Sequence, residues 1–226
     1  MTKDEINTSL ETLYPEWKHL SDSEREALAG AARQVRYKRG DAVHRGSLDC
    51  IGALLLIDGK LRVYMLSDQG KEVTLYRLSS GDMCILSASC VLRTITFDVH
   101  IDADSDVDAL LISPDIYGQV CESNIYAECH SYKLLSDRFS EVMWAMQQIL
   151  FMSFDKRLAI FLWDELTSTG GDTIALTHEQ LAKYIGSARE VVTRMLRYFS
   201  EEGIVELMRG GVKIIDRRKL KELTMK

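Results

Sequence analysis

Near the C-terminal end of the chain, apolar residues recur at helical spacing in two short runs. The runs consist of Leu181, Ala182 and Ile185, and of Val191, Val192, Met195 and Leu196. Gly186 lies between them, where a left-handed residue would end one helix before the next begins. Thr177 with Gln180, and Ser187 with Glu190, fit the capping box, so each helix has its own start signal. This pattern predicts two helices joined by a tight turn.

The apolar pattern changes period after these helices. Residues 204–208 and 212–215 flank the turn Arg209-Gly210-Gly211 and are typical of a β-hairpin. A Gly170-Gly171 turn before Thr173–Leu176 predicts a further short strand. Together these signals predict a winged helix-turn-helix, a fold that inserts its second helix into the major groove of DNA.

The middle of the chain has the residue pattern of short β-strands. From Val35 to Ile112, short β-branched or apolar runs are broken by turn signals at roughly ten-residue spacing, which indicates a small barrel or jelly roll. Asp58-Gly59 lies between two such runs and predicts a two-residue hairpin. Residues 97–103 alternate apolar and polar side chains, as a half-buried strand does.

Helical patterns flank the strand region on both sides. The first 31 residues contain spaced leucines and a capping box at Ser21-Asp22-Ser23-Glu24. Residues 128–151 form an apolar stripe on a helix of about 24 residues, about 36 Å long, which exceeds what a small barrel needs. We therefore expect part of the stripe to pack against a second copy of the chain, although packing within one chain would also explain it. The residues predicted for this dimer seam are Leu135, Phe139, Val142, Met143, Met146 and Leu150.

These elements predict an α+β fold in three parts. Residues 1–124 would form a jelly-roll β-barrel of cyclic-nucleotide-binding type with N-terminal helices, and residues 125–152 the dimerisation helix. Ser153 interrupts the stripe, which places a junction near Met152-Ser153. Residues 153–226 would form the winged helix-turn-helix domain.

The charge of the chain is unevenly distributed. The net charge is −6, but residues 174–226 carry 11 Lys and Arg against 7 Asp and Glu, whereas the remainder has a net charge of −10. A basic end on an acidic body suits a DNA-reading domain attached to a sensing domain, although a solvated basic tail would also account for the charge.

Composition limits which classes of protein this chain can belong to. The chain has no run of about 18 apolar residues and no signal-peptide pattern at its start, so we expect a soluble cytoplasmic protein without a membrane partner. Five cysteines without a close pair do not favour a disulfide framework or a zinc ribbon. His44 and His100 are isolated, so the histidine cluster of a metal-dependent cupin enzyme is missing and neither a catalytic nor a metal site is predicted.

The order of barrel, long helix, capped helix-turn-helix and wing resembles the CRP/FNR family of bacterial transcription regulators over nearly the whole chain. The pattern Ser-x-Arg-Glu-x-x-x-Arg at Ser187, Arg189, Glu190 and Arg194 resembles the recognition helix of that family. The resemblance implies a homodimer that binds double-stranded DNA, contacts RNA polymerase and responds to a small-molecule effector through the barrel. A ligand-binding module without a DNA target is the alternative.

Groove chemistry assigns roles to the recognition residues. An Arg can give a bidentate hydrogen bond to guanine, and a Glu can accept from the cytosine amino group. The predicted base contacts are Arg189, Glu190, Thr193 and Arg194. The predicted backbone contacts are Thr177, Gln180, Ser187, Arg197, Arg209 and Lys213. Two arginines resemble the cyclic-AMP receptor branch and imply palindromic TGTGA-like half-sites. Glu190 could instead only cap its helix, and Arg197 could pair with Glu201.

The effector remains unidentified at this stage. Relatives that bind cyclic AMP hold its phosphate with an Arg-Ser pair and a Gly-Glu pair, whereas Phe97-Asp98 and residues 84–87 stand at the matching positions here. A carboxylate facing a phosphodiester is unfavourable, so cyclic AMP is not the expected effector. Weak candidates for the pocket are Ser87, Ser89, Arg93 and Thr94. No cysteine precedes Cys50, which argues against the FNR iron–sulfur cluster; a thiol, metal or haem switch stays open, and the cofactor is unknown.

Overall fold

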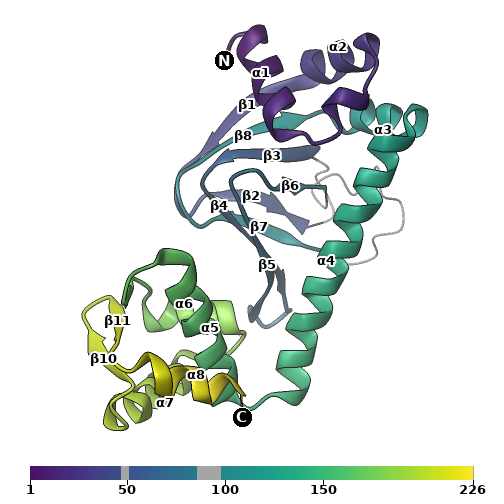
Figure 1. The fold of residues 1–226 in the computed structure, drawn as a ribbon. Coiled ribbons are helices and arrows are strands. Elements are labelled where there is room, and N and C mark those ends of the chain that lie inside the picture. Colours follow the sequence, from purple (N-terminus) through teal and green to yellow (C-terminus); the bar gives the residue numbers. More distant parts are fainter. Residues whose placement is uncertain (47–50, 86–97, 226) are drawn as a thin grey trace. The chain divides into compact units, whose positions relative to one another are not determined.

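The computed structural model describes residues 1–46, 51–85 and 98–225. The chain divides into two compact units, Met1–Met65 with Leu75–Val142, and Leu66–Thr74 with Met143–Lys226. No helix in the described ranges is long and apolar enough to cross a membrane. The predicted fold class, with a β-rich first part, a long helix and a winged helix-turn-helix, is confirmed (Figure 1).

The first unit begins with helices that cover a sheet. These elements are α1 (Lys3–Leu13), the short 3-10 helix η1 (Trp17–His19) and α2 (Asp22–Ala31). Ser21 caps α2 through the predicted capping box with Glu24. Leu10 and Leu28 are fully buried beside Leu55 and Ile112 of the adjacent sheet, so the helices close one apolar face of that sheet (Figure 1).

Among the described residues of this unit, two four-stranded antiparallel sheets form its body. The first has the order β1 (Ala32–Tyr37), β8 (Val107–Ile112), β3 (Ala53–Asp58), β6 (Met83–Cys84); the second has the order β2 (Ala42–Arg45), β7 (His100–Ala103), β4 (Lys60–Leu66), β5 (Glu72–Ser79). Leu54 and Leu56 of β3 pack with Val63 and Ile101 of the second sheet, while Leu55 packs on the helices. Because β3 is buried on both faces, its sequence is continuously apolar rather than alternating.

The hairpin predicted across Asp58-Gly59 is wrong. β3 and β4 lie in different sheets, so the chain crosses from one sheet to the other at this point. Gly59 has φ +100°, and a Cβ there would lie 2.4 Å from the carbonyl oxygen of Asp106. Glycine is therefore required by a close crossing of two backbones, and not by a two-residue hairpin turn.

The long helix is α4 (Ile125–Phe151), preceded by α3 (Pro114–Ser123). It begins at Ile125, the predicted first residue of the dimerisation helix and three residues before the apolar stripe, because the Asn124 side-chain oxygen accepts from the backbone N–H groups of Tyr126 and Ala127, at 3.0 and 3.3 Å. The break expected at Met152-Ser153 is present: Ser153 is the extended residue that precedes α5 (Phe154–Thr169).

The remaining elements surround a third apolar core. They are β9 (Thr173–Ile174), α6 (His178–Ile185), α7 (Arg189–Glu201), β10 (Val205–Met208), β11 (Gly211–Ile214) and α8 (Arg217–Met225). The predicted wing is present as the antiparallel pair β10–β11, and β9 adds a third strand to it. The sequence interpretation missed α8, reading its basic run only as charge. Leu220 on α8 is fully buried, and the Asp216 carboxylate accepts from the backbone N–H groups of Arg218 and Lys219, so an apolar position and a cap were the available signals.

Candidate nucleic-acid interface

The helix α6 starts and ends where its sequence signals predict. The Thr177 hydroxyl accepts from the Gln180 N–H at 3.2 Å, and the Gln180 side-chain oxygen accepts from the Thr177 N–H at 2.9 Å. Gly186 ends the helix with φ +66° and ψ 48°, the left-handed conformation that favours glycine. The turn between α6 and α7 is therefore encoded by residues within ten positions of one another.

The second predicted capping box is wrong. α7 begins at Arg189 with Ala188 as its cap residue, and no side chain caps it. Ser187 lies one residue before the cap position of α7. Its own N–H donates to the Ala182 carbonyl oxygen at 2.9 Å, and this bond belongs to the C-terminal end of α6. Glu190 therefore does not form a capping box, and the alternative role weighed for it is removed.

The helix α7 has one buried face and one charged, exposed face. Val192, Leu196 and Phe199 have no exposed surface and pack into the third core. On the opposite side a shallow hollow is lined by Arg189, Glu190, Thr193, Arg194, Arg197, Tyr198 and Glu201. The helical period places these side chains on one stripe, because positions three and four apart are neighbours. The four predicted base contacts are thus brought together.

Thr193 and Tyr198 differ from the charged residues of the stripe in their hydrogen bonds and in their side-chain chemistry. The Thr193 hydroxyl donates to the Arg189 carbonyl oxygen at 2.9 Å and also contacts His178 Nδ1 at 3.0 Å. Tyr198 is half exposed in the hollow, four residues after Arg194, and the sequence interpretation did not single it out. Its spacing from Arg194 was a sufficient signal.

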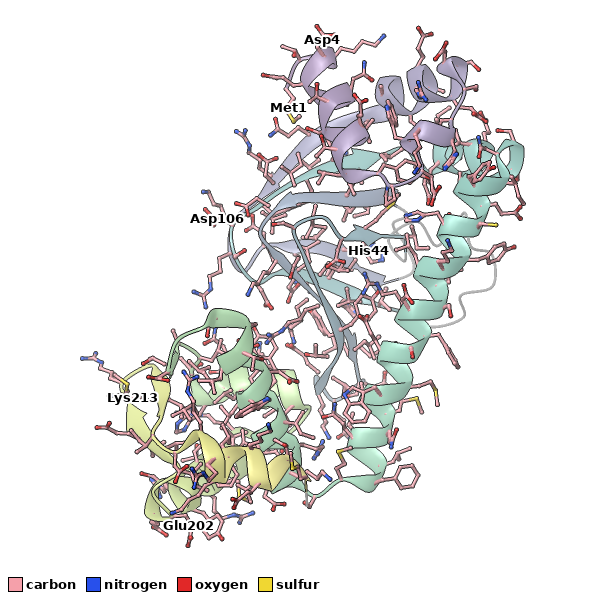
Figure 2. The ribbon with its side chains drawn as sticks, viewed as in Figure 1. Met1, Asp4, His44, Asp106, Glu202 and Lys213 are labelled. Atoms are coloured by element: carbon pink, nitrogen blue, oxygen red, sulfur yellow. The ribbon has the colours of Figure 1, made fainter. Side chains whose placement is uncertain are left out.

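Of the six predicted backbone contacts, Arg197 lies on the α7 stripe itself and the other five lie outside α7. Thr177 is exposed and Gln180 partly exposed on α6, and Arg209 and Lys213 are exposed on the wing. Figure 2 labels Lys213 on β11, where its side chain extends outward. Cations on both the helix and the wing make one face suited to a polyanion.

The six residues predicted for the dimer seam separate into two groups. Leu135 and Val142 are partly buried and pack against the cores of their own chain. The other four are exposed by 46–67% of their surface: Phe139, Met143, Met146 and Leu150. Tyr132, with 62% of its surface exposed, and the exposed Cys129 lie on the same side of α4 by helical spacing and were not among the predicted residues.

Most of the residues predicted to take part in effector sensing lie outside the part of the chain that the structure describes. Ser87, Ser89, Arg93 and Thr94, and also Cys50 and Cys90, lie outside the described residues. Cys84 is buried, and burial raises the pKa of the half-buried Cys121 thiol. Within residues 1–46, 51–85 and 98–225, no group of three or more His, Cys, Asp or Glu gathers as it would to hold a metal ion.

Two helices joined by a tight turn, an exposed cationic stripe and a three-stranded wing define a winged helix-turn-helix DNA-binding domain. Residues 156–223 match the family model described as the Crp-like helix-turn-helix domain. The solved structure of a candidate transcriptional regulator of the Crp/Fnr family from Eubacterium rectale is 41% identical, with a TM-score of 0.92 over 95% of this chain and 100% of that chain. The chain belongs to the CRP/FNR family of transcription regulators, which are not enzymes.

Two curated relatives extend over most of the chain. The candidate transcriptional regulator Flp of Lacticaseibacillus casei is 26% identical over 92% of this chain and 94% of its own length. The cyclic AMP receptor protein of Thermus thermophilus is 25% identical over 75% of this chain and 77% of its own length.

Proposed function

We propose that this regulator is a homodimer that reads a palindromic DNA site with TGTGA-like half-sites and responds to an effector held by the β-rich unit. The observation that carries the proposal is the division of α7 into a fully buried apolar face and an exposed stripe containing Arg189, Glu190 and Arg194. Such a helix is held rigidly by its core while its polar edge is available to bases.

Specificity would come from the exposed stripe. Arg189 and Arg194 would each bind guanine through O6 and N7, and Glu190 would accept from a cytosine amino group. The Thr193 hydroxyl already makes two hydrogen bonds within the domain, so its role would be a methyl contact to a thymine. Thr177, Gln180, Ser187, Arg197, Arg209 and Lys213 would contact phosphates and fix the register.

The dimer would form along α4. Cys129, Tyr132, Phe139, Met143, Met146 and Leu150, with Ser136 between the second and third, follow each other at alternating intervals of three and four residues. That is the spacing of a two-stranded coiled-coil seam. Five of these residues are large, apolar and at least 46% exposed. A continuous apolar stripe of this kind indicates an interaction surface.

The seam makes a direct prediction about Cys129. In a parallel, in-register helix pair, each seam residue faces its own copy, so Cys129 would face Cys129 of the partner subunit. We expect mild oxidation with diamide to convert most of the protein to a reducible covalent dimer on a non-reducing gel, because seam geometry brings the thiols within disulfide reach. Cys129→Ser should remove this product. Equal cross-linking of Cys129→Ser and the unsubstituted protein would contradict the parallel register.

The residue at position 98 bears on which effector the β-rich unit would hold. Asp98 lies at the position where relatives that bind cyclic AMP have the Ser of the phosphate-binding pair, so the effector would be a molecule other than cyclic AMP. The regulator would work in the cytoplasm, where bacterial DNA and its further partner, RNA polymerase, are found.

Selection of binding sites from random double-stranded DNA tests the function. The expected result is an inverted repeat of TGTGA-like half-sites about one helical turn apart, because the two recognition helices of a symmetric dimer enter successive major grooves. Running the selection with and without a small-molecule extract would show whether an effector is needed. Recovery of sequences without any inverted repeat would contradict the proposal.

A further inference from the structure

His178 links the two helices of the DNA-binding motif. It is the first residue of α6, and its Nδ1 lies 3.0 Å from the Thr193 hydroxyl of α7. Thr193 lies on the exposed stripe between Arg189 and Arg197, so the imidazole is at the edge of the surface assigned to DNA. The side chain is partly buried there.

The Thr193 contact fixes which ring nitrogen carries the proton. A hydroxyl has one hydrogen, and Thr193 gives it to the Arg189 carbonyl oxygen at 2.9 Å. The contact with His178 must therefore run the other way, with Nδ1–H donating to the hydroxyl oxygen. In the neutral ring this leaves Nε2 as a lone-pair acceptor, and a second proton would turn Nε2 into a donor.

The surroundings of this ring disfavour its protonation in the free protein. Partial burial, followed by the positive charges of Arg189 and Arg197 on α7, lowers the pKa of His178 below its usual range. In the described part of the chain, these two arginines are the charged groups that act on the ring. Arg197 is predicted to contact a phosphate and Arg189 a guanine base, so the nearby phosphates of bound DNA would offset the repulsion that disfavours protonation of the ring.

We propose that His178 is a proton-linked contact to the DNA backbone: on binding, Nε2 takes up a proton from solvent and donates it in a hydrogen bond to a phosphate oxygen. The proposal rests on the proposed DNA-binding function and adds a residue and a pH dependence to it. Thr177 and Gln180, assigned to phosphates, belong to the same first turn of α6, which brings the backbone within reach of the ring. Thr193 holds Nδ1, so that Nε2 is the nitrogen left for the phosphate.

The sign of the pH effect follows from linkage. The DNA complex binds more protons than the free protein in the pH range between the lowered pKa of free His178 and its raised pKa in the complex. DNA affinity therefore increases as pH falls through this range. Each proton taken up contributes at most about a tenfold change in the dissociation constant per pH unit, and a dimer can take up two.

The test compares the slope of affinity against pH in three proteins. Fluorescence anisotropy would measure the dissociation constant of a labelled duplex carrying TGTGA and its inverted repeat, from pH 6 to pH 8 at constant ionic strength. His178→Gln keeps an N–H donor for Thr193 but cannot titrate, so its slope should be clearly smaller than that of the unsubstituted protein. His19→Gln changes a histidine outside the DNA-binding domain and should retain the full slope. Equal slopes for His178→Gln and the unsubstituted protein would overturn the proposal.

A second measurement observes the protonation of the ring directly in the unsubstituted protein. NMR titration of the imidazole Cε1–H signals, with His178 assigned by its loss in His178→Gln, should show a higher pKa in the DNA complex than in the free protein. An unchanged or lower value would overturn the proton-linked contact. Discrimination between the TGTGA duplex and a scrambled duplex reports separately on the function: its loss at every pH would defeat the proposed function, whereas intact discrimination with equal slopes would defeat only the role of His178.

Discussion

Replacing Arg194 with alanine is expected to remove the preference for TGTGA over scrambled DNA while leaving non-specific binding almost intact. Arg194 is exposed on the α7 stripe, so its removal leaves the buried face of Val192, Leu196 and Phe199 unchanged. A bidentate Arg–guanine pair contributes about 1–3 kcal/mol of discrimination. Since a dimer makes the contact twice, we expect a loss of about 2–6 kcal/mol, or roughly thirty-fold to more than ten-thousand-fold in specific affinity. Competition binding with both duplexes measures it.

The matched control for this prediction is Lys213→Ala. Lys213 is exposed on the wing and is assigned to a phosphate, so its loss should weaken binding to all sequences alike and reduce the salt slope by about one. Thermal unfolding should be nearly unchanged in both variants, because exposed substitutions cost little stability. If Arg194→Ala weakened both duplexes equally, as Lys213→Ala should, the base-reading assignment of Arg194 would be wrong.

Replacing Phe139 with glutamate is expected to convert the proposed dimer to a monomer. Phe139 is 67% exposed at the centre of the α4 seam, so the substitution leaves its own core largely undisturbed. In a dimer, the same change would bury two carboxylates opposite each other without partners, which costs far more than the lost apolar contact. Light scattering would report the mass in solution. DNA affinity should fall by about a hundred-fold or more, because the second half-site is no longer bound as part of one complex.

Ser140→Glu is the control for the seam. It adds the same charge to an exposed position one residue further along α4, outside the alternating three- and four-residue spacing. We expect Ser140→Glu to remain dimeric and to bind the palindromic duplex with little loss. A dimeric Phe139→Glu variant would place the interface elsewhere on the chain.

The helix-turn-helix that carries the proposed DNA surface could largely be predicted from the sequence because its determinants are local. Thr177, Gln180 and Gly186 lie within ten residues of one another and define α6 through hydrogen bonds to neighbouring backbone groups. The helical period alone separates the buried face of α7 from the stripe that contains Arg189 and Arg194. The start of α7 was misplaced because Ser187 has two possible backbone roles, and the closure of α6 uses it.

Other features depended on partners that are distant along the chain. Leu135 and Val142 share the apolar stripe of α4 with Phe139, and only the position of the β-rich core shows that these two pack within their own chain. The contact between His178 and Thr193 joins residues 15 positions apart across two helices, and no pattern in either helix indicates it.

The sequence by itself determined the capped helices α2 and α6, the wing, and which face of α7 is charged, because hydrogen bonds and burial within a few residues decide these features. Only the tertiary structure decided that Asp58-Gly59 connects two sheets, that Leu220 anchors a final helix, and which nitrogen of His178 holds the proton. Strand pairing and side-chain partners depend on groups brought together by folding, and the local sequence on either side is compatible with more than one of them.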